Sequence, residues 1–349
     1  MERPQRHASP PAGGDPERKE ASILPPEVID IRQFNAEAFE SLLAAESRAW
    51  NTALHWDYGP SRRLIATCLD EKRLSGYALR VGDELIGYSF FFYEGEKGLI
   101  GNLFIAAEGA RLEPAFLLLK HIIETVLATP ALARVETQLP HFSMEELEPC
   151  FRPHQFESYV RRFMLLPLAS RRRALYGNAG AATPAVASSP TRGFTVVPWE
   201  RKHDRAAAEL VYGAYRAHVD AHINDQYSTL AGTTRLIENI VHQRGCGEML
   251  SPASLVAVHQ ASGKLAAALA VTAVRSRTAH IPQIAVAREF QAAGLGTALM
   301  ENSFQELIRR GFEEVSLTVT ELNAGAVRLY ERLGFSTLRT FGAFTWNRG

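Results

Sequence analysis

The fold of this chain is decided by the stretch QIAVAREFQAAGLGTALM at residues 283–300. It begins with small and apolar residues that suit a short buried strand, Gly294 and Gly296 interrupt that pattern, and apolar side chains then recur at helical spacing. Glycines let successive backbone N–H groups approach an anion, and the start of a helix adds positive potential. The stretch therefore predicts a strand, a pyrophosphate-binding loop and a helix, although glycines at such a turn also serve turn geometry alone.

A second informative stretch, ELNAGAVRLYERLGF, covers residues 321–335 and follows a strand-like run at residues 315–319. Asn323 is a predicted N-cap, and Gly334 is a predicted stop for the helix between them. Tyr330 follows Asn323 by two helical turns, so both side chains face the same side of that helix. We expect this face to contact a single ligand.

At these two stretches the chain resembles the GNAT superfamily of acetyl-CoA-dependent N-acetyltransferases. Gln291, Gly294 and Gly296 match its Q/R-x-x-G-x-G/A pyrophosphate loop, and residues 323–335 are similar to its second conserved block. The resemblance covers roughly residues 193–349, with a weaker echo in the earlier half. It implies acetyl-CoA as co-substrate.

Composition narrows the class of protein. The 349 residues exceed one typical domain, and 38 basic side chains cancel 38 acidic ones, so nothing favours nucleic acid or an anionic membrane as a partner. Cys68, Cys150 and Cys246 are few and far apart, which argues against a disulfide framework or a metal cluster. The sequence contains no apolar run of membrane-spanning length and no secretory signal. We expect a soluble cytoplasmic protein that needs no metal. The sequence does not indicate the oligomeric state.

The order of predicted elements indicates an internal duplication. Residues 1–25 have almost no large apolar side chains and are expected to form a disordered tail. Residues 26–169 read as two strands, a third strand, a helix, a strand and a closing strand, and the same order recurs in residues 193–349 after a linker at residues 170–192. We predict an α+β protein of two tandem GNAT-like domains, each a mixed, mostly antiparallel twisted sheet flanked by helices.

The first copy departs from the second where CoA would bind. Its corresponding loop, AAEGARLEP at residues 106–114, has a single glycine and two acidic residues, which would repel a pyrophosphate. We interpret it as a degenerate copy that supports the fold or shapes the acceptor cleft. The arginines at residues 171–173 could steer an anionic ligand, but a solvated end of the linker is the simpler interpretation.

The resemblance also implies an acceptor wall near residues 217–227, which are dense in hydrogen-bonding side chains. His218 and His222 have the i, i+4 spacing that can chelate zinc, but no third ligand is placed as metalloprotease motifs require. Polar side chains on an exposed helix end are an equally good interpretation. The candidate substrate residues are His218, Asp220, His222 and Tyr227, with Glu248 further along the chain.

By the same resemblance, the main chain of Ile284 and Val286 would pair with the pantetheine arm, and one N–H there would polarise the acetyl carbonyl. Asn323 would hydrogen-bond the cofactor, or would only cap its helix. The residues implied to cradle the pyrophosphate are Gln291, Ala292, Ala293, Gly294, Leu295, Gly296 and Thr297.

Tyr330 holds the position of the superfamily's usual acid. A phenol with a pKa of about 10 is protonated at neutral pH and can protonate the departing thiolate of CoA, whereas packing between helix and sheet is the alternative role. The implied reaction is direct attack of a primary amine, on a small molecule or a peptide, in a ternary complex. The base that deprotonates the amine stays open among Glu248, His280 and His222.

Two other functions compete with acetyl transfer. A dinucleotide-binding fold needs a third glycine where Leu299 stands, and no ribose-binding acid follows the helix in a βαβ unit. The second is a non-catalytic acyl-CoA-binding sensor or structural module. The presence of Tyr330 beside an intact loop favours catalysis.

Overall fold

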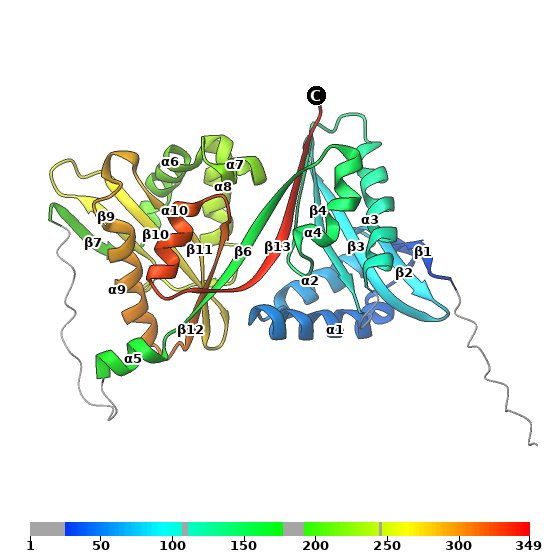
Figure 1. The fold of residues 1–349 in the computed structure, drawn as a ribbon, viewed down its shortest axis with the longest axis horizontal. Coiled ribbons are helices and arrows are strands. Elements are labelled where there is room, and N and C mark those ends of the chain that lie inside the picture. Colours follow the sequence, from blue (N-terminus) through cyan, green and yellow to red (C-terminus); the bar gives the residue numbers. More distant parts are fainter. Residues whose placement is uncertain (1–24, 107–110, 177–191, 244–245) are drawn as a thin grey trace, which may run out of the picture.

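The computed structural model describes residues 25–106, 111–176, 192–243 and 246–349. Its N-terminal half (residues 25–168) and C-terminal half (residues 169–349) form two lobes bridged by two long strands (Figure 1). The strands of the N-terminal half are β1 (Glu27–Asp30), β2 (Ser75–Val81), β3 (Glu84–Glu94), β4 (Lys97–Ile105), β5 (Arg134–Leu139) and β6 (Glu157–Pro167). Those of the C-terminal half are β7 (Phe194–Pro198), β8 (Glu248–Met249), β9 (Leu255–His259), β10 (Leu265–Arg275), β11 (Thr278–Val286), β12 (Glu314–Thr320) and β13 (Ser336–Asn347).

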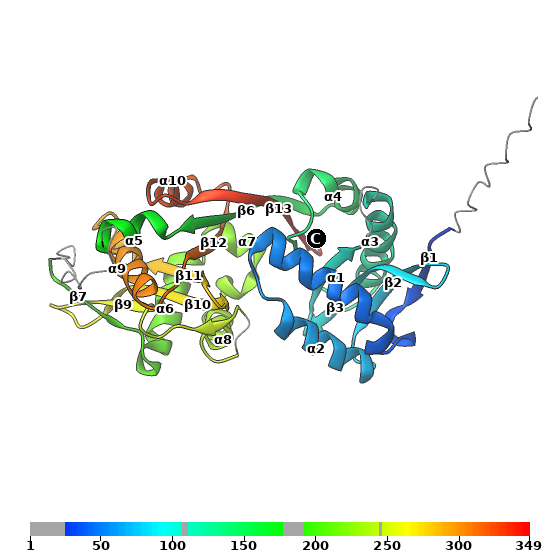
Figure 2. The ribbon, with the colours of Figure 1, turned by 90° about the horizontal axis from the view of Figure 1, so that it is seen from below.

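Helices cover both faces of the sheet, as Figure 2 shows from below. In the N-terminal half they are α1 (Ala36–Leu54), α2 (Gly59–Asp70), α3 (Leu112–Leu127) and α4 (Met144–Phe151). In the C-terminal half they are α5 (Ala169–Tyr176), α6 (Asp204–Tyr215), α7 (Val219–Ile223), α8 (Leu230–Val241), α9 (Leu295–Arg309) and α10 (Ala324–Arg332). The predicted α+β class, with a mostly antiparallel mixed sheet and flanking helices, is confirmed. None of the described helices is long and apolar enough to cross a bilayer.

The closing strands are exchanged between the halves, so the described strands form one sheet of 13 strands. β6 of the N-terminal half pairs with β12, and β13 of the C-terminal half pairs with β5 and with β6. The predicted order of strands did not indicate this exchange. An alternating apolar pattern identifies a strand but does not identify its partner, because pairing depends on which open edge the chain reaches. The domain boundaries at residues 26–169 and 193–349 stay a prediction.

The helix that follows β6 corrects the predicted linker. α5 packs on the C-terminal half: the Arg171 guanidinium donates to the carbonyl of Leu333 at 2.9 Å and lies 4.9 Å from the centre of the Phe304 ring. Arg172 donates to the carbonyl of Phe312 at 2.8 Å. Arg171 and Arg172 are therefore half-buried and satisfy backbone carbonyls near helix ends, where a solvated linker end was expected, whereas Arg173 is exposed. Residues 177–191 of the predicted linker, the predicted tail up to residue 24 and residues 107–110 of the acidic loop lie outside the described residues.

Local signals explain most of the helix boundaries. α1 begins after Asn35, whose side chain accepts a hydrogen bond from the backbone N–H of Ala38 at 3.1 Å. It ends before His55, which has a left-handed φ of 54°. α2 was not predicted, although Pro60 in its first turn is a typical start signal.

Candidate functional site

The sheet opens between β11 and β12. Their parallel pairing ends at Ile281 and Leu317, before either strand ends. Pro282 follows, which has no N–H to donate, and the register of β11 with β10 shifts at this point. One edge of β11, at Ile284 and Val286, therefore faces a gap instead of a neighbouring strand.

The main chain along this open edge directs hydrogen-bonding groups toward the gap. The N–H of Ala287 donates to the carbonyl of Ala266 next to β10, at 2.8 Å. Because the two sides of a strand alternate, the N–H groups of Ile284 and Val286 point away from β10, toward the gap. The Tyr215 hydroxyl on α6 donates to the carbonyl of Ile284 at 2.8 Å. These are the groups that we predicted to pair with a pantetheine arm.

The glycine loop has the predicted order of strand, loop and helix, with α9 beginning at Leu295. Ala292 and Gly294 have φ angles of 65° and 76°, in the left-handed region that favours glycine. Such backbone turns direct neighbouring N–H groups to one side, and the first N–H groups of α9, including those of Gly296 and Thr297, have no acceptor within the helix. The loop therefore presents several donors suited to an anion.

The loop and the open edge are adjacent. A Cβ atom placed on Gly296 would lie 3.7 Å from Cγ2 of Val286 and 3.9 Å from Cδ1 of Ile284. The predicted contacts for a pyrophosphate and for a pantetheine arm thus form one continuous path from the loop to the gap between β11 and β12.

Asn323, the N-cap of α10, and Tyr330 within that helix both have structural roles. Asn323 accepts a hydrogen bond from the N–H of Ala326 at 3.2 Å and caps the helix. Tyr330 is 7% exposed, and its ring centre lies 5.9 Å from that of Phe335. Burial, and to a lesser degree the charge of Asp220, raises the pKa of Tyr330 above its usual value. The phenol is therefore protonated at neutral pH. Asp220, whose charge contributes to the shift, belongs to residues 217–227, which we call the acceptor segment.

A cavity of about 370 Å³ adjoins the point where β11 and β12 diverge, and its walls come from both halves. Of the predicted substrate residues, Asp220 and Tyr227 line it, whereas His218, His222 and Glu248 are not among the described residues that do. The aromatic or charged residues of the lining are Trp50, Trp56, Tyr58, Arg161, Phe163, Asp220, Tyr227, His280 and Phe341.

Asp220 and Tyr227 are fixed by buried partners. The Asp220 carboxylate accepts hydrogen bonds from Arg161 of β6, at 2.8 Å, and from the Thr320 hydroxyl. The Tyr227 hydroxyl donates to the Gln283 side chain at 2.9 Å. Arg161 belongs to the exchanged strand, so the N-terminal half contributes directly to this wall.

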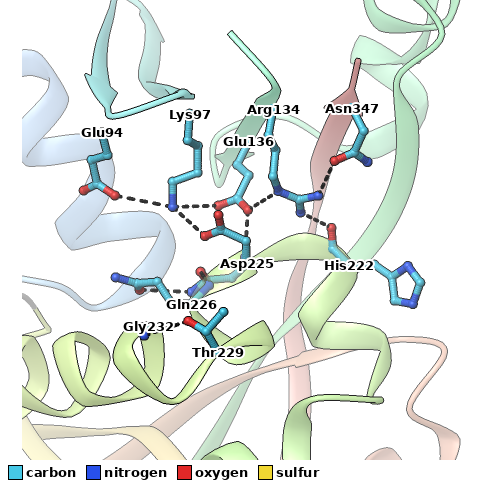
Figure 3. A network of polar contacts seen from close by, with 11 residues as sticks. Glu94, Lys97, Arg134, Glu136, His222, Asp225, Gln226, Thr229, Gly232 and Asn347 are labelled. Atoms are coloured by element: carbon cyan, nitrogen blue, oxygen red, sulfur yellow. Dashed lines mark hydrogen bonds and ion pairs between the residues drawn. The ribbon is translucent and has the colours of Figure 1, made fainter. Parts of the chain in front are cut away.

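The other predicted substrate residues lie outside the cavity. The His218 ring accepts a hydrogen bond from the N–H of Asp220 at 3.2 Å and caps α7. His222 is exposed, and Figure 3 shows its ring pointing away from the neighbouring polar network. Glu248 lies on β8, opposite Ala273. Their contact with substrate stays a prediction, and among the described residues no group of three or more His, Cys, Asp or Glu side chains could hold a metal ion.

His280 lines the cavity, and its hydrogen bonds indicate which ring nitrogen carries the proton. Its Nδ1 lies 2.9 Å from the Ser316 hydroxyl, which itself donates to the carbonyl of Ala279 at 3.3 Å. The serine oxygen therefore accepts from Nδ1–H, which leaves Nε2 as the ring nitrogen that can take up a proton. Burial lowers the pKa of His280 to about 3, so the imidazole is neutral at physiological pH.

The burial of His280 predicts how stability depends on pH. The pKa of His280 is about 3 in the folded protein and 6.5 for an ordinary histidine. Because the unfolded chain therefore binds the proton more readily, the free energy of unfolding decreases as pH falls below 6.5. We expect His280→Asn to weaken this loss by about 2 kcal/mol between pH 6.5 and 5. Urea unfolding at both pH values measures the change, with His222→Asn at an exposed ring as control. Equal pH dependence in wild type and His280→Asn would contradict the prediction.

A buried ionic network, shown in Figure 3, joins the acceptor segment to the N-terminal half. The Lys97 ammonium lies 2.7 Å from a carboxylate oxygen of Asp225, and the N–H of Asp225 donates to Glu136 at 2.8 Å. Arg134 donates to Glu136 at 2.6 Å and to the carbonyl of His222 at 2.5 Å. Lys97 and Glu136 are 8% and 6% exposed. The segment that carries Asp220 and Tyr227 is therefore held by β4 and β5.

The sequence analysis allowed the N-terminal half to shape the acceptor cleft, but it did not identify which of its residues line the cavity. The aromatic side chains of Trp56 and Tyr58 in an otherwise polar stretch were the available signal. Their proximity to His280 depends on the packing of residues far apart in the chain, which a local pattern does not contain.

Comparison with known proteins agrees with this geometry. Residues 219–335 match the model of the acetyltransferase (GNAT) family. The chain is 44% identical over 75 residues to the [ribosomal protein bS18]-alanine N-acetyltransferase of Escherichia coli K12, a match that covers 22% of this chain and 50% of that enzyme. The counterpart in Salmonella typhimurium is 44% identical over 70 residues, or 20% and 47% of the two chains. The chain thus spans about half the length of the curated relatives it matches.

Solved structures extend the similarity to both halves. A GCN5-related N-acetyltransferase from Sphaerobacter thermophilus has a TM-score of 0.63 at 17% identity, covering 93% of this chain and 96% of that one. A tandem GNAT protein from the clavulanic acid biosynthesis pathway has a TM-score of 0.58 at 16% identity, covering 93% and 99%. At these identities the likeness establishes the tandem fold alone.

Proposed function

We propose that this chain, whose residues 219–335 belong to the GNAT family of acetyltransferases, transfers an acetyl group from acetyl-CoA to a primary amine. The observation that carries the proposal is the open edge of β11, which runs from the glycine loop to a cavity lined by both halves. One end of this path suits a pyrophosphate and the other suits an amine, so a thioester bound along the path would meet the amine where β11 and β12 diverge.

Each group along the path has a proposed contact with acetyl-CoA. The N–H groups at Gly294 to Thr297 would bind the pyrophosphate, and the main chain of Ile284 and Val286 would pair with the pantetheine arm. Asn323 would complete the cofactor contacts through its amide nitrogen, because its oxygen already caps α10. Acetyl-CoA supplies the activated acyl group, and the chain's own residues place it and move the protons.

The reaction we propose is a direct transfer. The amine nitrogen attacks the thioester carbon, an N–H of the open edge stabilises the oxygen as charge develops, and the carbon–sulfur bond then breaks. Tyr330 donates its proton to the leaving sulfur. Nε2 of His280 accepts the proton that the amine nitrogen loses; of the three candidate bases, His280 is the one that lines the cavity. A neutral imidazole can take up this proton, because the ammonium of the tetrahedral intermediate is far more acidic than the conjugate acid of the free amine.

Titration calorimetry with acetyl-CoA tests the cofactor part of this proposal. We expect micromolar binding by the wild type and loss of at least 100-fold in affinity in Gly294→Glu/Gly296→Glu, because two carboxylates would face the pyrophosphate. Gly311→Glu is the matched control, since Gly311 has a similar φ of 85° and nothing lies within 4 Å of an added Cβ at Gly311 or at Gly294.

Acetyl-CoA binding, measured together with thiol release, also distinguishes a transferase from a non-catalytic acyl-CoA sensor. Binding together with thiol release in the presence of amines supports the transferase. Binding without release across a broad set of amines would favour an acyl-CoA sensor, and no binding by the wild type would refute both functions.

Two classes of amine are candidates for the acceptor. The Escherichia coli relative is named for acetylating an alanine of a ribosomal protein, which makes a peptide amine one candidate. A small-molecule amine is the other.

A further inference from the structure

We propose that the acceptor is a small primary amine with an aromatic body, and that Trp56 of the N-terminal half determines this specificity. This inference rests on the proposed acetyl transfer and names its second substrate. It is carried by the placement of the segment between α1 and α2 against the cavity.

The wall opposite the acceptor segment is aromatic. The N-terminal half contributes Trp50, Trp56 and Tyr58, and the exchanged strands contribute Phe163 and Phe341. The Trp56 ring meets His280 at 5.0 Å between ring centres and at an interplanar angle of 68°. An aromatic body bound here gains edge-to-face contacts with these rings in addition to its burial.

The segment that carries Trp56 is anchored on the C-terminal half. The N–H of Asp57 donates to the carbonyl of Val274 at 2.9 Å, and the His55 ring lies 2.8 Å from the Glu314 carboxylate. Both contacts cross between the halves and flank Trp56 in sequence. Trp56 is therefore held at the site of the proposed chemistry by groups on either side of it, which suits a residue that selects the acceptor.

The charges of the cavity are already paired. Among its lining residues, the ionised side chains are Arg161 and Asp220, which bind each other at 2.8 Å. His280 is neutral for the reason given above. Besides these groups and the aromatic residues, the polar side chains of the lining are Ser61, Gln138, Asn224 and Thr318, so a peptide with several amide groups would leave more of its hydrogen bonds to water unreplaced than a single-ring amine. A volume of about 370 Å³ is in the range of small-ligand sites.

The test compares three acceptors with acetyl-CoA as donor: 2-phenylethylamine, hexylamine and a tripeptide with an N-terminal alanine. We expect kcat/KM to be at least tenfold higher for 2-phenylethylamine than for either of the others. Equal use of hexylamine would overturn the aromatic part of the inference, and preference for the tripeptide would overturn it entirely. In both cases acetyl transfer itself would stand, whereas failure of acetyl-CoA to bind would refute the proposed function instead.

Two variants at one position isolate the role of Trp56. We expect Trp56→Ala to lower kcat/KM for 2-phenylethylamine about tenfold and Trp56→Phe to retain most of it, because a ring is restored. The affinity for acetyl-CoA should be unchanged in both, which also reports that the protein is folded. Tyr93→Ala is the control, because Tyr93 is a 43% exposed aromatic residue of the same half and does not line the cavity. Loss of activity toward all three acceptors alike in Trp56→Ala would contradict a role in selection.

Discussion

In the Tyr330→Phe variant we expect kcat for acetyl transfer to fall at least 100-fold, with the affinity for acetyl-CoA unchanged. The expectation follows from the role of a general acid, since protonation of a leaving group contributes about 10² to 10⁴-fold in rate. The Tyr330 phenol keeps its proton at neutral pH because burial raises its pKa. Removing only the hydroxyl leaves the ring contact with Phe335 in place.

Steady-state kinetics with saturating acetyl-CoA measure the loss. Tyr212→Phe, which removes a hydroxyl from a half-buried tyrosine of α6, is the matched control and should leave kcat unchanged. If Tyr330→Phe kept full turnover, the phenol would serve packing alone, and the proton for the thiolate would have to come from water.

The second large effect concerns stability: Lys97→Met is expected to lower the free energy of unfolding by about 3 kcal/mol. Lys97, which is itself 8% exposed, lies 2.7 Å from the Asp225 carboxylate and 3.6 Å from that of Glu136, so its removal leaves two carboxylates with Arg134 as their remaining cation. The same substitution frees Asp225 and the acceptor segment, so KM for the amine should rise while the affinity for acetyl-CoA is kept.

Urea unfolding provides the measurement, and the chain offers an exposed pair for comparison. Arg277 and Glu313 lie 2.6 Å apart with side chains 59% and 53% exposed, so Arg277→Met should cost less than about 1 kcal/mol. A cost for Lys97→Met no larger than for Arg277→Met would show that the network in Figure 3 does not stabilise the fold.

The sequence predicted the elements around the glycine loop well because their signals are local. The strand before Ala287, the helix from Leu295 and the capped helix after Asn323 follow from glycine positions, capping residues and apolar spacing. The roles assigned to Gln291, Tyr330 and their neighbours rest on a resemblance, and they stay predictions until the variants are measured.

What the sequence could not predict depends on contacts between distant residues. Nothing near Arg161 indicates that β6 crosses to β12, and nothing near Lys97 indicates a partner at Asp225. The cavity has the same origin: Trp56 and His280 meet because Asp57 and Val274 share a backbone hydrogen bond. Periodicity reports which face of an element is buried, but it does not report what lies against that face.

The exchange of β6 and β13 has a consequence for how the protein is made. The ribosome releases β5 long before β13, so the edge of β5 that pairs with β13 has no partner while the intervening residues are synthesised. Unpaired edges of this kind invite pairing with other chains, and contacts between such distant segments slow folding. The nascent N-terminal half therefore stays incomplete until β13 has been synthesised. Each half thus needs a strand of the other to complete its sheet.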